Sequence, residues 1–327
     1  MADSPCEATK RLHNMMNRLP WKDDRGGDHV DPYVSQEVAD ALAQGRPVVA
    51  LESTIITHGL PRPRNLDVAL AAEDVLRGQG VTPATVGVLR GRVTVGLSVD
   101  ELRELSLDDN AIKCSIRDLP VAMARGASGG TTVAATAFLA HRAGIKVFPT
   151  GGLGGVHRGA SQTYDESADL VALSQIPVVM VSAGVKSILD VGATLERLET
   201  LNVAVLGYGT DAFPGFYIAD SGFPAPFRVD SPEEVTAIAN ARDALGIGAA
   251  VLVARPVPTE HQLDADLHAR VLADALAAAD AQGVHGHDVT PFLLDYFHTA
   301  THGASEGTNV EIYLGNVALG GKIAAAW

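Results

Sequence analysis

The chain has 327 residues, of which 46% are hydrophobic, 20% charged and 5% aromatic, a globular composition whose core consists mainly of Ala, Val, Leu and Ile. Its 39 acidic and 25 basic residues give a formal charge of −14, which repels nucleic-acid polymers and anionic membranes. Cys6 and Cys114 have neither disulfide nor metal-ligand spacing, and no apolar run reaches the roughly 18 residues that span a bilayer, so we expect a cytoplasmic protein.

Residues 1–31 are polar and aperiodic, which predicts a poorly ordered N-terminal extension; the alternative is a tail that packs on a neighbouring subunit. Residues 32–327 are predicted to form a single domain. In them, Val-rich runs alternate with Ala/Leu-rich segments of helical period, beginning with VVALES, NLDVALAAEDVLRG and ATVGVLRGRVTVGL. Further apolar runs follow at IKVFPT, IPVVMVSAG, NVAVLGYG and GAAVLVA. This alternation predicts an α/β fold with a helix-covered, largely parallel sheet, made mixed by a hairpin at Arg90-Gly91.

Several helix starts carry capping signals. Ser98 with Glu101 and Ser231 with Pro232 and Glu234 are typical of helix N-termini. The segment TEHQLDADLHARVLADALAAADAQG is predicted to be one long amphipathic helix, whose Ala-rich face packs either within the monomer or between subunits.

The first strand pattern contains a carboxylate. RPVVALESTIITHGLP has the pattern of a strand that enters a buried sheet, yet it carries Glu52 in its middle, where a partnered buried acid is the simplest interpretation. Burial among residues such as Val49, Leu51 and Ile55 would favour the protonated carboxyl.

Two glycine-rich loops are candidate ligand sites. GASGGTTVAATAFLAHRAG feeds a helix that begins near Thr131 or Thr132, which would suit a phosphate but is weak evidence alone. TGGLGGVHRGASQTYDESADL follows KVFPT, so it is expected at a carboxyl strand end. Its Asp165 and Asp169 are hard donors suited to Mg²⁺ or Mn²⁺, although Asp169 could equally be a helix N-terminal charge and His157 an ordinary loop histidine.

Lysines supply the other candidates. Lys186 in VSAGVKSILDVGATLERLET is predicted to end a strand directly before a helix capped by Ser187 with Asp190, a setting that disfavours the ammonium form. A neutral lysine is a nucleophile, whereas the alternative is a lysine whose head reaches solvent. Lys113 could hold a phosphate or lower the pKa of a nearby amine; the alternative is an ordinary surface pair with an acid such as Asp118. His58 could be a packing residue, and Asn309 could cap the C-terminal helix.

Set side by side, these segments resemble the indigoidine synthase A-like family of pseudouridine-5′-phosphate glycosidases. The resemblance runs from about Val34 to Ala254, and more loosely through VTPFLL. The matching stretches, in family order, are VVALESTIITHGLPRPRN, KCSIRDLP, GTTVAAT, FPTGGLGGVHRGA, YDESADL, AGVKSILDVGATLERLET, GYGTDAFPGFY and VDSPEEV.

The resemblance implies reversible cleavage of the C–C bond between uracil and ribose 5-phosphate, by a homotrimer of α/β/α subunits that uses Mn²⁺ or another divalent cation. It makes Glu52 the proton donor, Lys186 the nucleophile and Asp165 the metal ligand. The positions that it implies for the substrate are Lys113, Val133, Thr150, His157, Ser167, Ala168, Asp169 and Asn309.

The C-terminal stretch EGTNVEIYLGNVALGG departs from the family's Ala/Asn-rich helix, and the chain lacks the Gly-Ala-Gly-Asp signature of the sugar kinase fused to some members. Kinase activity is therefore not expected. Three rival functions stay open: a Schiff-base aldolase or dehydratase, a catalytically silent nucleotide-binding or regulatory protein, and an enzyme for a related C-nucleoside phosphate.

Overall fold

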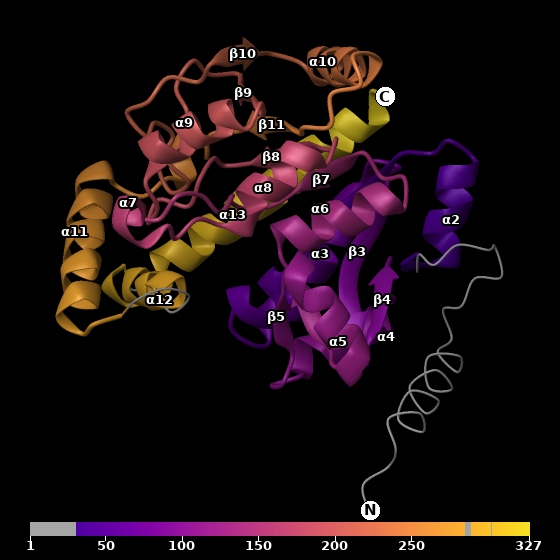
Figure 1. Cartoon of the computed structure of the whole chain (residues 1–327), viewed down its shortest axis with the longest axis horizontal. Helices are drawn as coiled ribbons and strands as arrows, with labels where there is room; N and C mark the ends of the chain where they lie inside the picture. Colours follow the sequence, from indigo (N-terminus) through magenta and orange to yellow (C-terminus); the bar gives the residue numbers. More distant parts are fainter. Residues whose placement is uncertain (1–30, 285–288, 302) are drawn as a thin grey trace, which may run out of the picture.

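A computed structural model of the chain describes residues 31–284, 289–301 and 303–327, so all but the last residue of the predicted N-terminal extension lies outside the described residues. Within them a largely parallel sheet is covered by helices on both faces, which confirms the predicted α/β class (Figure 1). The strands are β1 Tyr33–Val34, β2 Val48–Leu51, β3 Thr82–Leu89, β4 Arg92–Val95, β5 Ile112–Cys114, β6 Gly129–Thr131, β7 Val147–Pro149, β8 Val179–Ser182, β9 Ala204–Tyr208, β10 Phe227–Val229 and β11 Val251–Ala254.

The strand order is β1-β4-β3-β2-β7-β8-β11-β9-β10, with β6 pairing β3 and β5. Only the pairs β3–β4 and β3–β6 are antiparallel among the described strands. The first is the predicted hairpin, in which Leu89 pairs with Arg92 and both turn residues, Arg90 and Gly91, have positive φ. The central strands β2, β7 and β8 are parallel neighbours, so their carboxyl ends meet at one edge.

Successive strand residues face opposite helix layers. Val48 and Ala50 belong to the core shared with α6 and α8, whereas Val49 and Leu51 belong to the core shared with α3, α10 and α13. The helices are α2 Gln36–Ala43, α3 Arg64–Gly78, α4 Val99–Leu107, α5 Leu119–Arg125, α6 Val133–Arg142, α7 Ala160–Thr163, α8 Ala168–Gln175, α9 Val191–Thr200, α10 Pro232–Ala244, α11 Ala265–Ala281, α12 Val289–Ala300 and α13 Ala304–Ala325. Shorter turns are the π-helical turn Ile55–Gly59 and the 3₁₀ turns Ile116–Asp118 and Thr259–His261.

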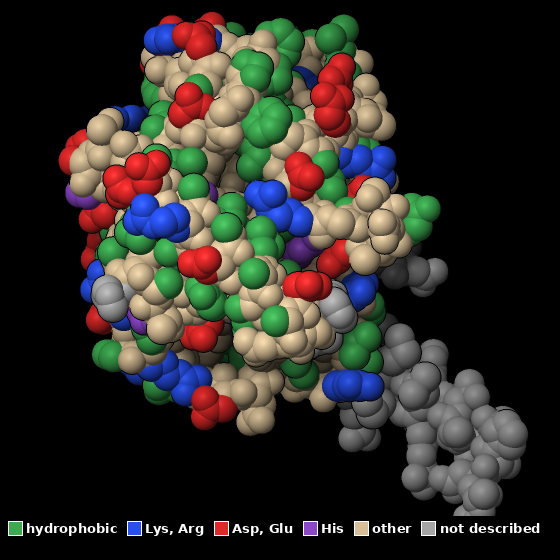
Figure 2. Space-filling model, turned by 90° about the vertical axis from the view of Figure 1, so that its left-hand side faces the viewer, with side chains coloured by type: hydrophobic (Ala, Val, Ile, Leu, Met, Phe, Trp, Pro, Cys, Tyr) green, Lys and Arg blue, Asp and Glu red, His purple; other side chains and the backbone are tan. Residues whose placement is uncertain are grey.

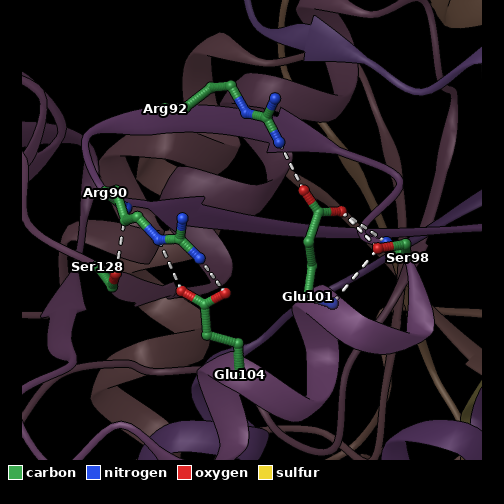
Figure 3. Close-up of polar contacts among 6 residues, drawn as sticks. All are labelled: Arg90, Arg92, Ser98, Glu101, Glu104 and Ser128. Atoms are coloured by element: carbon green, nitrogen blue, oxygen red, sulfur yellow. Dashed lines mark hydrogen bonds and ion pairs between the residues drawn. The ribbon is translucent and has the colours of Figure 1, made fainter.

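The predicted caps are formed at two helices. Ser98 and Glu101 exchange side-chain and backbone hydrogen bonds at the start of α4, where Glu101 also accepts from Arg92 and Arg90 pairs with Glu104 (Figure 3). Ser231 caps α10, with Pro232 at its first position. The predicted long helix is shorter than expected: α11 begins at Ala265, after the N-cap Asp264, and packs against α12.

Two other expectations are wrong. Ser187 does not cap a helix: β8 ends at Ser182, a turn follows, and Asp190 is the N-cap of α9 through its acceptor bond from Ala193 N–H. Asn309 is not a cap either, because α13 already begins at Ala304 after Gly303.

No helix in the described part of the chain is long and apolar enough to cross a membrane. On the side of the molecule that carries α7, α11 and α12, apolar, acidic and basic side chains are interspersed (Figure 2).

Candidate active site

Glu52 and Thr150 meet at the carboxyl ends of two neighbouring strands. Glu52 follows the last residue of β2 and Thr150 the last residue of β7, and the Thr150 hydroxyl donates a hydrogen bond to Glu52 Oε1. Thr150 is 1% exposed, and its own N–H donates to Val181 O of β8 at 2.8 Å. The carboxyl group is therefore held at the edge where three adjacent parallel strands end.

Lys186 is brought to the same edge by backbone pairing between two loops. Ala183 N–H donates to Gly151 O at 3.0 Å, and Lys186 N–H donates to Leu153 O at 3.1 Å. The loops fit this closely because Gly152 has no side chain: a Cβ there would lie 2.6 Å from the Phe216 ring and 3.2 Å from Lys186 Cγ. The stem of Lys186 and the ring of Phe216 thus both lie against Gly152.

Charged groups influence one another across the site. Burial raises the pKa of the Glu52 carboxyl, and the positive charges of Lys186 and Lys113 and the hydrogen bond from Thr150 oppose that rise. The Lys113 residue is exposed as a whole, but protein atoms crowd its ammonium, and this desolvation together with Lys186 lowers the pKa of Lys113. Glu52, Lys113 and Lys186 therefore form one electrostatic cluster. Asp118, the alternative partner for Lys113, instead lies 3.4 Å from Arg117 Nε and accepts from Ser115 N–H.

Asp169 joins the two glycine-rich segments. Its Oδ1 accepts from Ala134 N–H at the start of α6, and its Oδ2 accepts from Gly154 N–H, each at 3.0 Å. Ser167, the N-cap of α8, fixes Asp169 by accepting from its N–H at 3.2 Å. The carboxylate therefore neutralises the positive end of α6, where the sequence suggested a phosphate. The helix begins at Val133 after its N-cap Thr132, close to the predicted start near Thr131 or Thr132.

We expect Asp169→Asn to destabilise the protein by about 1–3 kcal/mol, because an amide nitrogen would then face a buried N–H donor. Urea unfolding of this variant measures the effect. Asp264→Asn, at the exposed N-cap of α11, is the matched control and should change stability by less than about 0.5 kcal/mol, because Asn caps helices as well as Asp does. Equal stabilities of the two variants would contradict the anchoring role.

Asp165 and His157 lie together in the loop after β7. The backbone N–H of His157 donates to the backbone carbonyl oxygen of Asp165 at 3.0 Å. The imidazole Nδ1 of His157 lies 3.8 Å from Asp165 Oδ2. Burial lowers the pKa of His157, Asp165 opposes this, and Lys113 and Lys186 add to it. Within residues 31–284, 289–301 and 303–327 no group of three or more His, Cys, Asp or Glu residues is placed to hold a metal ion. A metal here would therefore take most of its ligands from water and substrate.

The remaining predicted residues lie at different depths. Val133 is the buried first residue of α6, whereas Ala168 is the exposed first residue of α8. Asn309 of α13 lies beside the diglycine turn, since a Cβ on Gly151 would be 3.5 Å from its Oδ1.

Sequence reasoning missed two residues of this edge. Phe216 has φ +65°, unusual for an aromatic residue, and its ring covers Gly152. Asn316 donates to the carbonyl oxygens of Thr150 and Gly151. The available signal for Asn316 was a polar residue seven positions after Asn309, on the same face of a helix.

The fold and the side chains at this edge define an α/β protein with a combined lysine and carboxylate site. The chain belongs to the indigoidine synthase A-like family: the family model described as "Indigoidine synthase A like protein" matches residues 37–326. Like the relatives that carry enzyme names, it is an enzyme.

Two of those relatives are named pseudouridine-5′-phosphate glycosidase. The protein from Saccharopolyspora erythraea is 63% identical over 295 residues, covering 90% of this chain and 97% of its own length. The protein from Frankia alni is 57% identical over 294 residues, covering 90% of this chain and 81% of its own length.

Solved structures share the fold. The prealnumycin C-glycosynthase AlnA, in complex with ribulose 5-phosphate, has a TM-score of 0.85 at 36% identity and covers 90% of this chain and 96% of its own. An indigoidine synthase A-like protein from Thermotoga maritima has a TM-score of 0.82 at 36% identity, with coverages of 93% and 99%.

Proposed function

We propose that the protein is a pseudouridine-5′-phosphate glycosidase, which reversibly cleaves the C–C bond of pseudouridine 5′-phosphate to give uracil and ribose 5-phosphate. The observation that carries the proposal is the meeting of Glu52, Lys113 and Lys186 at one strand edge, in a chain 63% identical to a protein of that name. AlnA, solved with a sugar phosphate, supports the phosphosugar half of the substrate.

In the proposed mechanism, Glu52 first acts as a general acid. A C–C glycosidic bond has no leaving heteroatom to protonate, unlike the bonds of ordinary glycosidases. Glu52 instead donates its proton to the ribose ring oxygen, the bond from that oxygen to C1′ breaks, and the sugar opens. The raised pKa of Glu52 supports this role, because it keeps the carboxyl protonated to higher pH.

Lys186 then acts as the nucleophile. Its neutral amine adds to C1′ of the opened sugar, and the bond between C1′ and uracil breaks as the adduct forms an imine and uracil takes up a proton. Water hydrolyses the imine, which releases ribose 5-phosphate and the free amine. Lys113 lies close enough to Lys186 for the two side chains to interact, so it stands beside the reacting amine.

The activity test is a substrate screen of the purified enzyme. Pseudouridine 5′-phosphate should give equal amounts of uracil and ribose 5-phosphate, whereas phosphate-free pseudouridine should react much more slowly. Because AlnA is a C-glycosynthase, other C-nucleoside phosphates belong in the screen. Turnover of an aldol or dehydratase substrate without release of uracil would favour the Schiff-base rival, and tight binding without any turnover would favour the silent binding protein.

We further propose that Asp165, with His157 beside it, holds Mn²⁺ or another divalent cation, which would organise phosphate and water when bound. A single carboxylate with a nearby imidazole fits an ion that keeps several waters.

We expect Asp165→Ala to bind Mn²⁺ more weakly in calorimetry and to require more metal for activity after chelation. Asp190→Asn, which keeps the cap of α9, is the control. Unchanged Mn²⁺ affinity in Asp165→Ala would rule out this ligand.

A cytoplasmic homotrimer completes the proposal. The buried free thiol of Cys114 suits a reducing compartment. The exposed Phe223 and Phe227, with the half-buried Leu195, line a hollow of about 580 Å³, which supports a subunit contact. Light scattering measures the subunit number.

A further inference from the structure

Asn316 is fully buried in α13, yet its side chain serves a loop 166 residues away in the sequence. Its Nδ2 donates to Thr150 O at 2.8 Å and to Gly151 O at 3.2 Å, so one amide group serves two consecutive carbonyls. Its Oδ1 has no hydrogen-bond partner in the described part of the chain. The side-chain nitrogen of Asn316 thus has two acceptors, whereas its oxygen has no donor among the described residues.

Those two carbonyls belong to the turn that carries the partner of Glu52. Thr150 is fixed through its N–H by Val181 O and through its carbonyl by Asn316, which leaves the hydroxyl to donate to Glu52. This is the only side-chain hydrogen bond of the Glu52 carboxyl within the described residues. Gly151 O is held a second time, by Ala183 N–H at 3.0 Å.

We propose that Asn316 is a positioning residue of the enzyme, which keeps the Thr150 hydroxyl on the Glu52 carboxyl by clamping the Thr150–Gly151 turn. The inference rests on the proposed function, in which Glu52 is the general acid. Asn316 touches no reacting atom, and it acts only through Thr150.

The clamp determines how readily Glu52 gives up its proton. The hydrogen bond from Thr150 favours the ionised carboxylate and opposes the effect of burial on the pKa of Glu52. Without Asn316, two buried carbonyls lose a donor, the turn relaxes and the hydroxyl leaves the carboxyl. Glu52 would then hold its proton more tightly and be a weaker acid.

The test is a titration of Glu52 itself, which needs no turnover. Protein labelled with ¹³C at the glutamate side-chain carboxyl is followed by NMR against pH, and the signal absent from Glu52→Gln identifies Glu52. We expect Thr150→Val and Asn316→Leu each to move the midpoint of the Glu52 titration to higher pH. The double variant should move this midpoint no further than Thr150→Val alone.

Thr308→Ala is the matched control, because it removes a buried donor of the same helix that serves His261 O instead. It should leave the midpoint unchanged. If Asn316→Leu does not fold, Asn316→Ser provides the same measurement with a smaller side chain. A wild-type midpoint in the Asn316 variants or in Thr150→Val, or an equal shift in Thr308→Ala, would overturn the proposal.

Kinetics supply the second readout. Asn316→Leu should lower kcat on the order of tenfold with a smaller change in KM, whereas Thr308→Ala should not. If wild-type enzyme releases no uracil, the proposed function fails while the titration still decides the clamp.

Discussion

Replacing Lys186 with alanine is expected to lower uracil release by at least about 1,000-fold, because the variant lacks the amine that forms the imine in the proposed reaction. The variant should fold normally, since Lys186 is only partly buried and its backbone bonds, to Leu153 O and from Leu189 N–H, do not involve the side chain. Initial rates of uracil release and circular dichroism measure the two effects.

Lys146→Ala is the matched control for this experiment. Lys146 precedes β7 at the opposite end of the sheet, where its ammonium lies 4.2 Å from the centre of the Trp327 ring. Its loss should leave the rate within about twofold of wild type, because surface substitutions rarely affect a distant site. Residual activity in Lys186→Ala near that of Lys146→Ala would contradict the nucleophile assignment.

Glu52→Gln is expected to fold normally and to lower kcat about 10²–10⁴-fold, the range typical of a general acid. Glutamine keeps an oxygen that can accept from the Thr150 hydroxyl, so the hydrogen bond survives while the transferable proton is lost. The measurements are kcat at saturating pseudouridine 5′-phosphate and, separately, the affinity of the variant for ribose 5-phosphate.

The same substitution has a predicted effect on stability against pH. Burial raises the folded-state pKa of Glu52 above its unfolded value, so folded protein holds this proton more tightly. The resulting stability is present below the unfolded pKa and is lost as pH rises through the folded pKa. Glu52→Gln removes this dependence, so we expect the variant to be at least as stable as wild type at neutral pH.

Denaturant unfolding at several pH values tests this expectation. The expectation fails if Glu52→Gln is less stable than wild type at neutral pH and its free energy of unfolding depends on pH as that of wild type does. Burial of the Glu52 carboxyl would then not lower the free energy of unfolding. In that case its carboxyl would be an ordinary partnered acid.

The parts of the fold that follow local rules were predictable from sequence. The Val-rich runs became β2, β3, β7, β8, β9 and β11, because a parallel sheet covered on both faces needs continuous apolar strands. The hairpin at Arg90-Gly91 and the caps at Ser98 and Ser231 depend on neighbours within a few residues. Such features are determined by side chains that are adjacent in the sequence.

Other elements depend on contacts distant in sequence. The strand Gly129–Thr131 resembles a loop by composition, and it is a strand because it pairs with β3 and β5. Ser187 has the spacing of a capping box with Asp190, but pairing of Leu153 with Val185 holds this segment in a turn and delays the helix to Val191. Local patterns cannot show such tertiary constraints.

The residues of the candidate site also fall into two groups, those that the sequence indicated and those that only the structure showed. The sequence indicated Glu52, Lys186 and the loop of Asp165 and Asp169 one motif at a time, and the resemblance to a known family supplied their roles. That Asp169 anchors two backbone N–H groups and that Asn316 clamps Thr150 required coordinates, since these contacts span 15 to 166 residues. The assignment of Asp165 to a metal, the single domain and the extension at residues 1–31 stay predictions.

The measurement that tests the central claim most directly is peptide mass mapping after borohydride reduction of the enzyme turning over pseudouridine 5′-phosphate. We expect one reduced adduct of ribose 5-phosphate, attached to Lys186, together with release of uracil. Release of uracil with no adduct, or with the adduct on another lysine such as Lys113, would contradict it.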